Sequence, residues 1–232
     1  MAITYPLTAP TAAIGPENVT LRLVTADAIS GSPFTFKQQV INLGGSRWEI
    51  TVSVPPVNRD TAEQWIAFLL SLKGRQGTFL LGDPMAATSM GAYSLPTSAY
   101  PTLQLNFSTQ TYGFTYYNLI PRINGSGQVG DTINVKGLLI SNAEVFKPGD
   151  YIQIGLGSSA TLHKVLTMTA SDADGKASID IAPALRSTSV DNTTIVVSSP
   201  RGVFRLKSNE TEWSIDKASK YGISFDAVEA LT

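Results

Sequence analysis

Cysteine is absent from the 232-residue chain, and histidine occurs once, at position 163. Without thiols the chain can form no disulfide, has no thiol nucleophile and lacks the ligand of most structural zinc sites. A single histidine also leaves few groups for the acid–base steps that enzymes most often assign to that residue. The composition therefore favours a non-enzymatic protein stabilised by packing and assembly, and it assigns no catalytic, cofactor-binding or metal-binding residue.

Charge is also scarce. Charged residues make up 15% of the chain, against roughly 25% in an ordinary soluble domain. The 17 basic and 18 acidic residues leave a net charge of −1, so no general attraction to nucleic acid or to an anionic membrane is expected. A surface with few charges suits coverage by partner subunits, although Thr and Ser on exposed strand faces produce the same composition.

Long hydrophobic runs are missing as well. No stretch approaches the roughly 18 apolar residues of a membrane-spanning helix, and the opening segment MAITYPLTAPTAAIG lacks the basic and apolar regions of a signal peptide. We therefore expect a soluble protein that is made and used without export. Hydrophobic residues still reach 43%, enough for the core of one large domain or two small ones.

Alternating apolar residues predict strands between Val19 and Pro56, in the runs VTLRLVT, FTFKQQVINL and SRWEITVSVPP. In the third run the even positions 48–54 are apolar and the odd positions 47–53 are polar, so one face should be covered. Gly44 and Gly45 predict a tight turn that joins the second and third runs as a hairpin over 34–56. This hairpin is our candidate for an edge that pairs with a neighbouring subunit.

One convincing helix, RDTAEQWIAFLLSLKG, follows at 59–74. Asp60 and Glu63 predict a capping box at its start, and Gly74 predicts its end. Its expected apolar stripe covers the sheet and consists of Trp65, Ile66, Leu69, Leu70 and Leu72. The run TFLLGDP then returns the chain to the sheet and ends in a turn.

A second unit is expected after a connector over 85–118 that is rich in Tyr and small residues and has scarcely a charge. Between 128 and 199 lie five short strand patterns, TINVKGLL, DYIQIGL, TLHKVLTMT, ASIDIAP and TTIVVSS, separated by turn residues. Such spacing is typical of a small barrel of the oligonucleotide/oligosaccharide-binding (OB) type.

Strand patterns like those of the first block return after Pro200, in GVFRLKS, EWSIDKASK and YGISFDAVEA. Their expected core residues are Trp213, Ile215, Ile223, Phe225 and Val228. Because the first block alone has too few strands for a stable sheet, we expect residues 1–90 and 200–232 to form one domain. Residues 91–199 would then be an inserted OB-like β-barrel module with its aromatic-rich connector, in a mainly β protein with one packed helix.

The residues that could take part in catalysis or metal binding each have a structural explanation. His163 sits in a strand pattern without nucleophile partners, and we expect it at an exposed or rim position. Asp172-Ala173-Asp174-Gly175 lacks the spacing of a calcium loop and predicts a hairpin turn, as do Asp131 and Asp150, each of which follows a glycine.

Two segments resemble parts of bacteriophage tail proteins. The run FTFKQQVINLGGSRWEITVSVPPVNRDTAEQWIAFLLSLKGRQGTFLLGDP resembles a segment of long-tailed phages in which a Gly-Gly-Ser-Arg-Trp motif precedes one helix and a Gly-Thr-Phe strand. The run FKPGDYIQIGLGSSATLHKVLTMTASDADGKASIDIAPALR is similar to a segment recurrent in tail-tip proteins. The nearest family is the distal tail protein of siphophages, although in some of its members the extra module follows the ring domain.

The resemblance implies a structural virion protein, not an enzyme. Residues 1–90 and 200–232 would be a β-sandwich or tail-tube-like domain that forms a homo-oligomeric, hexameric ring at the distal end of a long non-contractile tail. The ring would join the tail-tube protein to the hub and fibre proteins, DNA would pass through its lumen without specific binding, and assembly would take place in the host cytoplasm.

Two other functions stay open. The inserted barrel would bind a host glycan if several of its connector aromatics were exposed in a row, namely Tyr93, Tyr100, Tyr112, Phe114, Tyr116 and Tyr117. A cell-wall hydrolase would instead need two carboxylates roughly 5–10 Å apart in an open cleft.

Overall fold

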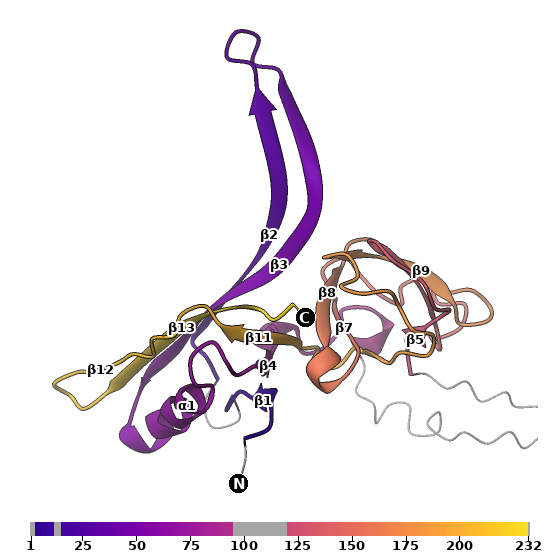
Figure 1. Cartoon of the computed structure of the whole chain (residues 1–232). Coiled ribbons are helices and arrows are strands. Elements are labelled where there is room, and N and C mark those ends of the chain that lie inside the picture. Colours follow the sequence, from indigo (N-terminus) through magenta and orange to yellow (C-terminus); the bar gives the residue numbers. More distant parts are fainter. Residues whose placement is uncertain (1–2, 12–14, 95–119, 232) are drawn as a thin grey trace, which may run out of the picture. The chain divides into compact units, whose positions relative to one another are not determined.

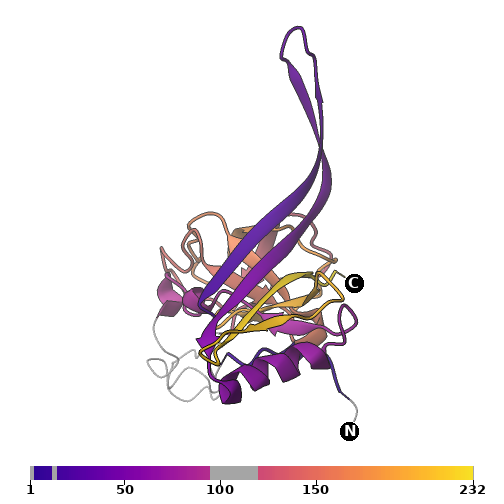
Figure 2. The same cartoon turned by 90° about the vertical axis from the view of Figure 1, so that its left-hand side faces the viewer.

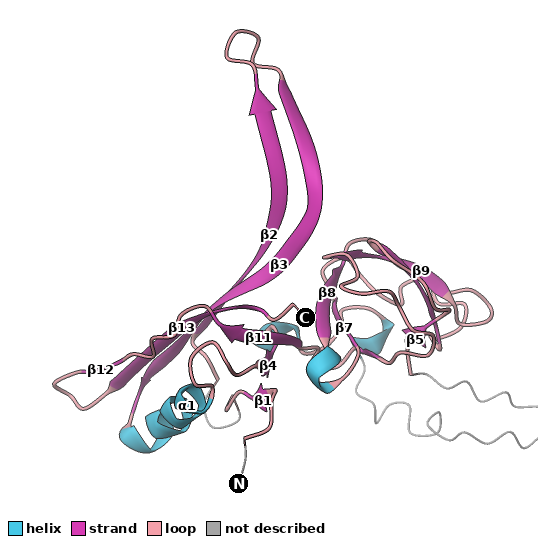
Figure 3. Cartoon of the chain, viewed as in Figure 1, coloured by secondary structure: helices cyan, strands magenta, loops and turns pink. Residues whose placement is uncertain are grey.

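The computed structural model describes residues 3–11, 15–94 and 120–231. The chain is mainly β with one α-helix among these residues, as predicted (Figure 3). It divides into two compact units, Met1–Phe79 with Phe204–Thr232 and Leu80–Val203. From the sequence, these boundaries are expected at residues 90 and 199. Most of the predicted connector, with every named aromatic except Tyr93, lies outside the described residues.

The first unit is built on a seven-stranded sheet in the order β1-β4-β11-β13-β3-β2, with β12 also paired to β13 (Figure 1). The sheet strands are β1 Leu7–Thr8, β2 Asn18–Gly31, β3 Gln38–Val57, β4 Phe79–Leu81, β11 Gly202–Leu206, β12 Trp213–Ile215 and β13 Tyr221–Glu229. The strands predicted in TFLLGDP and after Pro200 are therefore present. β13 lies between β3 and strands from the chain's last block, which explains how the N- and C-terminal segments share one sheet.

The predicted hairpin turn at Gly44-Gly45 is wrong. β3 runs through both glycines as one strand and pairs along its length with β2, and the connecting turn lies at 32–37. Ala26 faces Gly45 whereas the next residue, Asp27, faces Asn42, so β3 carries extra residues at this point. Gly44 has φ +73°, and the glycine pair therefore makes a β-bulge within a long strand.

Helix α1, Arg59–Ser71, covers one face of this sheet (Figure 2). The capping-box prediction is wrong, because the N-cap is Asn58 and its side chain makes no capping hydrogen bond. The helix ends before the left-handed residues Lys73 and Gly74, so the glycine acts as predicted near the C-terminus. Leu70 is 54% exposed, contrary to the predicted stripe, and Phe68 is buried in its place.

Aromatic rings fill the space between the helix and the sheet. Phe79 packs edge-on to Phe68 at 5.5 Å and to Phe225 at 6.1 Å between ring centroids. Trp65, from the middle of α1, also contacts Phe68 and Phe225. The predicted sheet face is confirmed here, since the apolar side chains at 48, 50, 52 and 54 are all buried.

The C-terminal strands follow the core prediction only in part. Ile223 and Val228 are buried and Phe225 is half-buried. Trp213 and Ile215 are 40% and 59% exposed, because β12 is a short strand that pairs with β13 alone.

The second unit is a nearly closed barrel of six strands in the order β10-β7-β8-β9-β6-β5. The strands are β5 Arg122–Ile123, β6 Thr132–Lys136, β7 Tyr151–Ile154, β8 Thr161–Val165, β9 Ala177–Ala182 and β10 Ile195–Val196. All five predicted strands are present. The ends of the path meet where Arg122 bridges Thr194, and the Ile195 N–H donates to the Pro121 carbonyl at 2.9 Å. Short 3₁₀ turns occur at Pro84–Ala86, Ala92–Ser94 and Gly157–Ser159.

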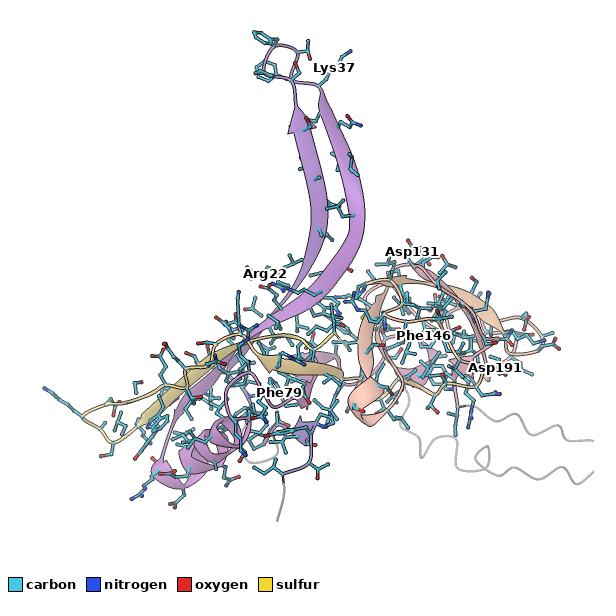
Figure 4. The ribbon with its side chains drawn as sticks, viewed as in Figure 1. Arg22, Lys37, Phe79, Asp131, Phe146 and Asp191 are labelled. Carbon is cyan, nitrogen blue, oxygen red and sulfur yellow. The ribbon has the colours of Figure 1, made fainter. Side chains whose placement is uncertain are left out.

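Apolar residues at alternate strand positions fill the barrel interior and pack around Phe146, which is fully buried (Figure 4). Tyr93 stacks on this ring at 5.6 Å between centroids, so the segment that enters the unit is packed against its core. No helix among the described residues has the length and apolar character to cross a bilayer.

Candidate subunit interface

The single histidine is a core residue, and the predicted exposed or rim position is wrong. His163 is fully buried in β8, with Nδ1 2.7 Å from the Pro183 carbonyl and Nε2 2.9 Å from Thr161 Oγ1. A carbonyl can only accept, so Nδ1 carries the proton and Nε2 accepts from the hydroxyl. Burial lowers the pKa of His163 to about 4, partly offset by the bond to Pro183.

The neutral ring is buried because both of its nitrogens have partners within the barrel. Alternation along β8 could have predicted that His163 is buried, since Val165, two residues further on, points to the same side and is buried. The arrangement leaves neither nitrogen free for a substrate, and His163 works as a structural residue of the barrel.

The two Gly-Asp turns differ in a way that sequence did not reveal. Asp131 is exposed. Asp150 is 3% exposed and accepts hydrogen bonds from Ser89 Oγ at 2.7 Å, the Met90 N–H at 2.6 Å and the Lys147 N–H at 2.9 Å. Its carboxylate thereby fixes the segment 89–90 to the turn that precedes β7.

The Asp172–Gly175 segment is a hydrogen-bonded turn, as predicted. Asp172 Oδ1 accepts from the Asp174 and Lys176 N–H groups at 2.9 and 2.8 Å, and Gly175 has φ +68°. Across the described ranges, no group of three or more potential metal-ligating side chains occurs.

The most unusual surface of the first unit is the distal part of the β2–β3 ribbon, residues 27–42, which we call the arm (Figure 1). Within the described chain, residues 27–31 and 38–42 pair only with each other, whereas nearer the helix β3 also pairs with β13. The arm therefore offers unpaired strand edges on both sides, which is the feature that most readily recruits another strand.

Apolar side chains of the arm and its base are exposed on both faces. Ile29 is opposite Val40 on one face, and Ala28 is opposite Ile41 on the other. The large exposed side chains are Ile29 (67%), Phe34 (92%), Phe36 (84%), Val40 (60%), Ile41 (52%) and Leu43 (66%). An isolated two-stranded ribbon is marginal in water, so contacts from another surface would stabilise this one.

Charges that would keep such an edge solvated are nearly missing. Between positions 27 and 43 only Asp27 and Lys37 are charged. Exposed strand edges are normally protected by lysines, inward charges or short length. The arm has none of these along its shaft, which makes it the candidate contact surface of this unit.

An ionic cluster holds the base of the arm, at the position of Arg22 in Figure 4. The Glu49 carboxylate is 9% exposed and contacts Arg22, Arg47 at 2.7 Å and Lys207 at 3.4 Å. Arg22 and then Arg47 lower the pKa of Glu49 to about 2, against the effect of burial. The polar face predicted for β3 is correct in orientation, but sequence could not show that three cations converge on this one carboxylate.

The glycan-binding alternative gains no support from Tyr93, which is half-buried on Phe146. Comparison with models of known protein families and with curated proteins finds no match.

Proposed function

We propose that this chain is a structural subunit of a long non-contractile bacteriophage tail. Copies form a homo-oligomeric ring, hexameric by analogy with the distal tail family, at the distal end of the tail tube. The ring joins the tube protein to the hub and fibre proteins within the virion.

The observation that carries the proposal is the arm. Both of its faces expose large apolar groups, its edges are unpaired, and its base is fixed by the Glu49 cluster. A ribbon that is held by ion pairs at its base and exposed along its length is expected in a subunit whose surface is completed by neighbours.

The rest of the chain fits this assembly. The sheet with α1 packed on one face would be the tail-tube-like domain, and the six-stranded unit would be an OB-like module. The two segments that resemble tail proteins span the arm tip to β4 and three of the six barrel strands, β7, β8 and β9. A net charge of −1 is compatible with a lumen through which DNA passes without being held.

The test is the solution mass of the full chain by light scattering, with negative-stain imaging of the same sample. A variant with Ile29, Val40 and Ile41 all changed to Ser removes the apolar faces of the arm and keeps the folded sheet. Wild type is expected to form rings and the variant to stay a single chain. If both proteins assembled equally, ring formation would not depend on the apolar side chains of the arm, and the proposal would lose its main support.

A further inference from the structure

The end of the first unit's sheet that lies away from the arm contains an open pocket. It has a volume of about 430 Å³ and lies between β12, β13 and the end of β3. Its apolar wall includes Val54, Pro56 and Trp213. Two acidic residues, Glu17 and Glu212, also line it, and both are exposed.

The arm tip has the complementary chemistry. Phe34 and Phe36 are 92% and 84% exposed, and the adjacent Lys37 is the only basic residue of the arm (Figure 4). The tip is an ordered turn, because the Phe36 N–H donates to the Ser32 carbonyl at 2.9 Å and the Ser32 N–H donates to the Lys37 carbonyl at 3.0 Å. Two aromatic rings and one cation are thus presented together.

The tip cannot fill the pocket of its own chain. β3 runs continuously from Gln38 at the tip to Val54 beside the pocket. At about 3.3 Å per residue this distance is roughly 50 Å. The complementary apolar and charged groups therefore favour the tip of a second copy as the occupant. A contact between two different surfaces of identical chains repeats from copy to copy and closes into a ring when the rotation between copies permits.

We propose that the arm tip of one subunit inserts into the β12 pocket of the next subunit. The rings of Phe34 and Phe36 pack against Trp213 and the neighbouring apolar wall, and Lys37 faces Glu17 and Glu212. This contact rests on the proposed ring, for which it supplies the direction and the two contacting surfaces.

The absence of cysteine allows a direct cross-linking test. Full chains with Thr35→Cys, which keeps both aromatic rings of the tip, are mixed with full chains with Ser214→Cys under mild oxidation, since Thr35 and Ser214 are exposed and Ser214 also lines the pocket. The matched control mixes Thr35→Cys with Glu63→Cys, whose parent side chain is 50% exposed on α1. The pocket pair should give at least a fivefold higher yield of disulfide-linked heterodimer than the control pair, because the bond needs close approach of the two β-carbons.

Charge reversal gives an independent readout. Lys37→Glu should weaken self-association by roughly 2- to 5-fold, the range for an exposed ion pair, and combination with Glu17→Lys and Glu212→Lys should restore it. Equal cross-linking of the pocket and control pairs, or no rescue by the combined charge reversal, would overturn the inference.

The outcomes also separate this contact from the proposed function. Rings without selective cross-linking would leave the tail-ring proposal standing and remove this contact. Selective cross-linking with only open chains or filaments would support the contact and contradict the ring.

Discussion

Acid should destabilise the second unit through His163. The folded-state pKa of about 4 lies below the ordinary value of 6.5, so the unfolded chain binds a proton more readily than the folded one. The stability contribution is therefore complete above pH 6.5 and is lost as the pH falls to about 4. The difference corresponds to about 3 kcal/mol in total, of which about 2.5 kcal/mol should be lost by pH 4.5.

The assay uses the fact that this histidine is the only one in the chain. Its imidazole proton resonances need no assignment, and their NMR titration gives the pKa directly. Hydrogen exchange of peptides that contain β8, corrected for intrinsic rates, gives the loss of stability between pH 7 and 4.5. His163→Asn keeps an N–H donor near the Pro183 carbonyl but removes the titration. Its protection should be lower at pH 7 and nearly independent of pH down to 4.5. A measured pKa near 6.5, or equal pH dependence in wild type and variant, would refute the burial argument.

Three further variants test the packing and the ionic contacts. Glu49→Gln should lower the free energy of unfolding of the first unit by about 2 kcal/mol at pH 7, a value reduced because the cations are partly exposed to solvent. It should also remove the loss of stability expected for wild type between pH 4.5 and 2. Tryptophan fluorescence in urea measures the unfolding of this unit, and an unchanged midpoint would contradict the role of the cluster. Asp150→Ala should lower the free energy of unfolding by about 2–3 kcal/mol and speed hydrogen exchange at residues 89–91, because three donors lose their acceptor. The matched Asp131→Ala should lower it by less than about 0.5 kcal/mol. Similar effects at both sites would show that burial of the Asp150 carboxylate does not matter. Leu69→Ala should cost about 2–4 kcal/mol in urea unfolding and Leu70→Ala almost nothing, since the two side chains are 2% and 54% exposed; the reverse order would show that the helix face is misassigned.

Strand patterns were the most informative part of the sequence. Period-two alternation located the inward face of β3 and the strands of the barrel, because each strand there has one side in a core. It could not distinguish a bulge from a turn at Gly44-Gly45, since both use a glycine with positive φ. The pairing partner of β3 decides between them, and alternation alone does not show that this partner is the preceding strand β2, with Ala26 opposite Gly45.

The side chains that matter for stability were harder to predict, because their partners lie far away in the sequence. Asp131 and Asp150 follow identical glycines, but only Asp150 meets donors from residues 89 and 90, about sixty positions away. His163 likewise depends on a carbonyl from β9's end, and Glu49 on a lysine beyond β11. Alternation in the sequence shows on which face of a strand a side chain lies, but it does not show which group that side chain will contact.

The arm illustrates the same limit for the candidate interface. Its apolar residues were visible in FTFKQQVINL, and a chain-pairing edge was expected in this region. The position of the edge was not, because the expected turn would have folded residues 34–43 back onto 46–56 and given the arm no length. With the turn at 32–37, those same residues extend away from the helix and lack a cover in the described chain.

The most direct test of the central proposal is the mass of the full chain in solution, measured by light scattering over a wide range of concentrations and paired with negative-stain imaging. We expect a closed ring with about six times the 24.7 kDa mass of one chain, and loss of that ring when the apolar side chains of the arm are changed to Ser. A particle with the mass of a single chain at every concentration would contradict it.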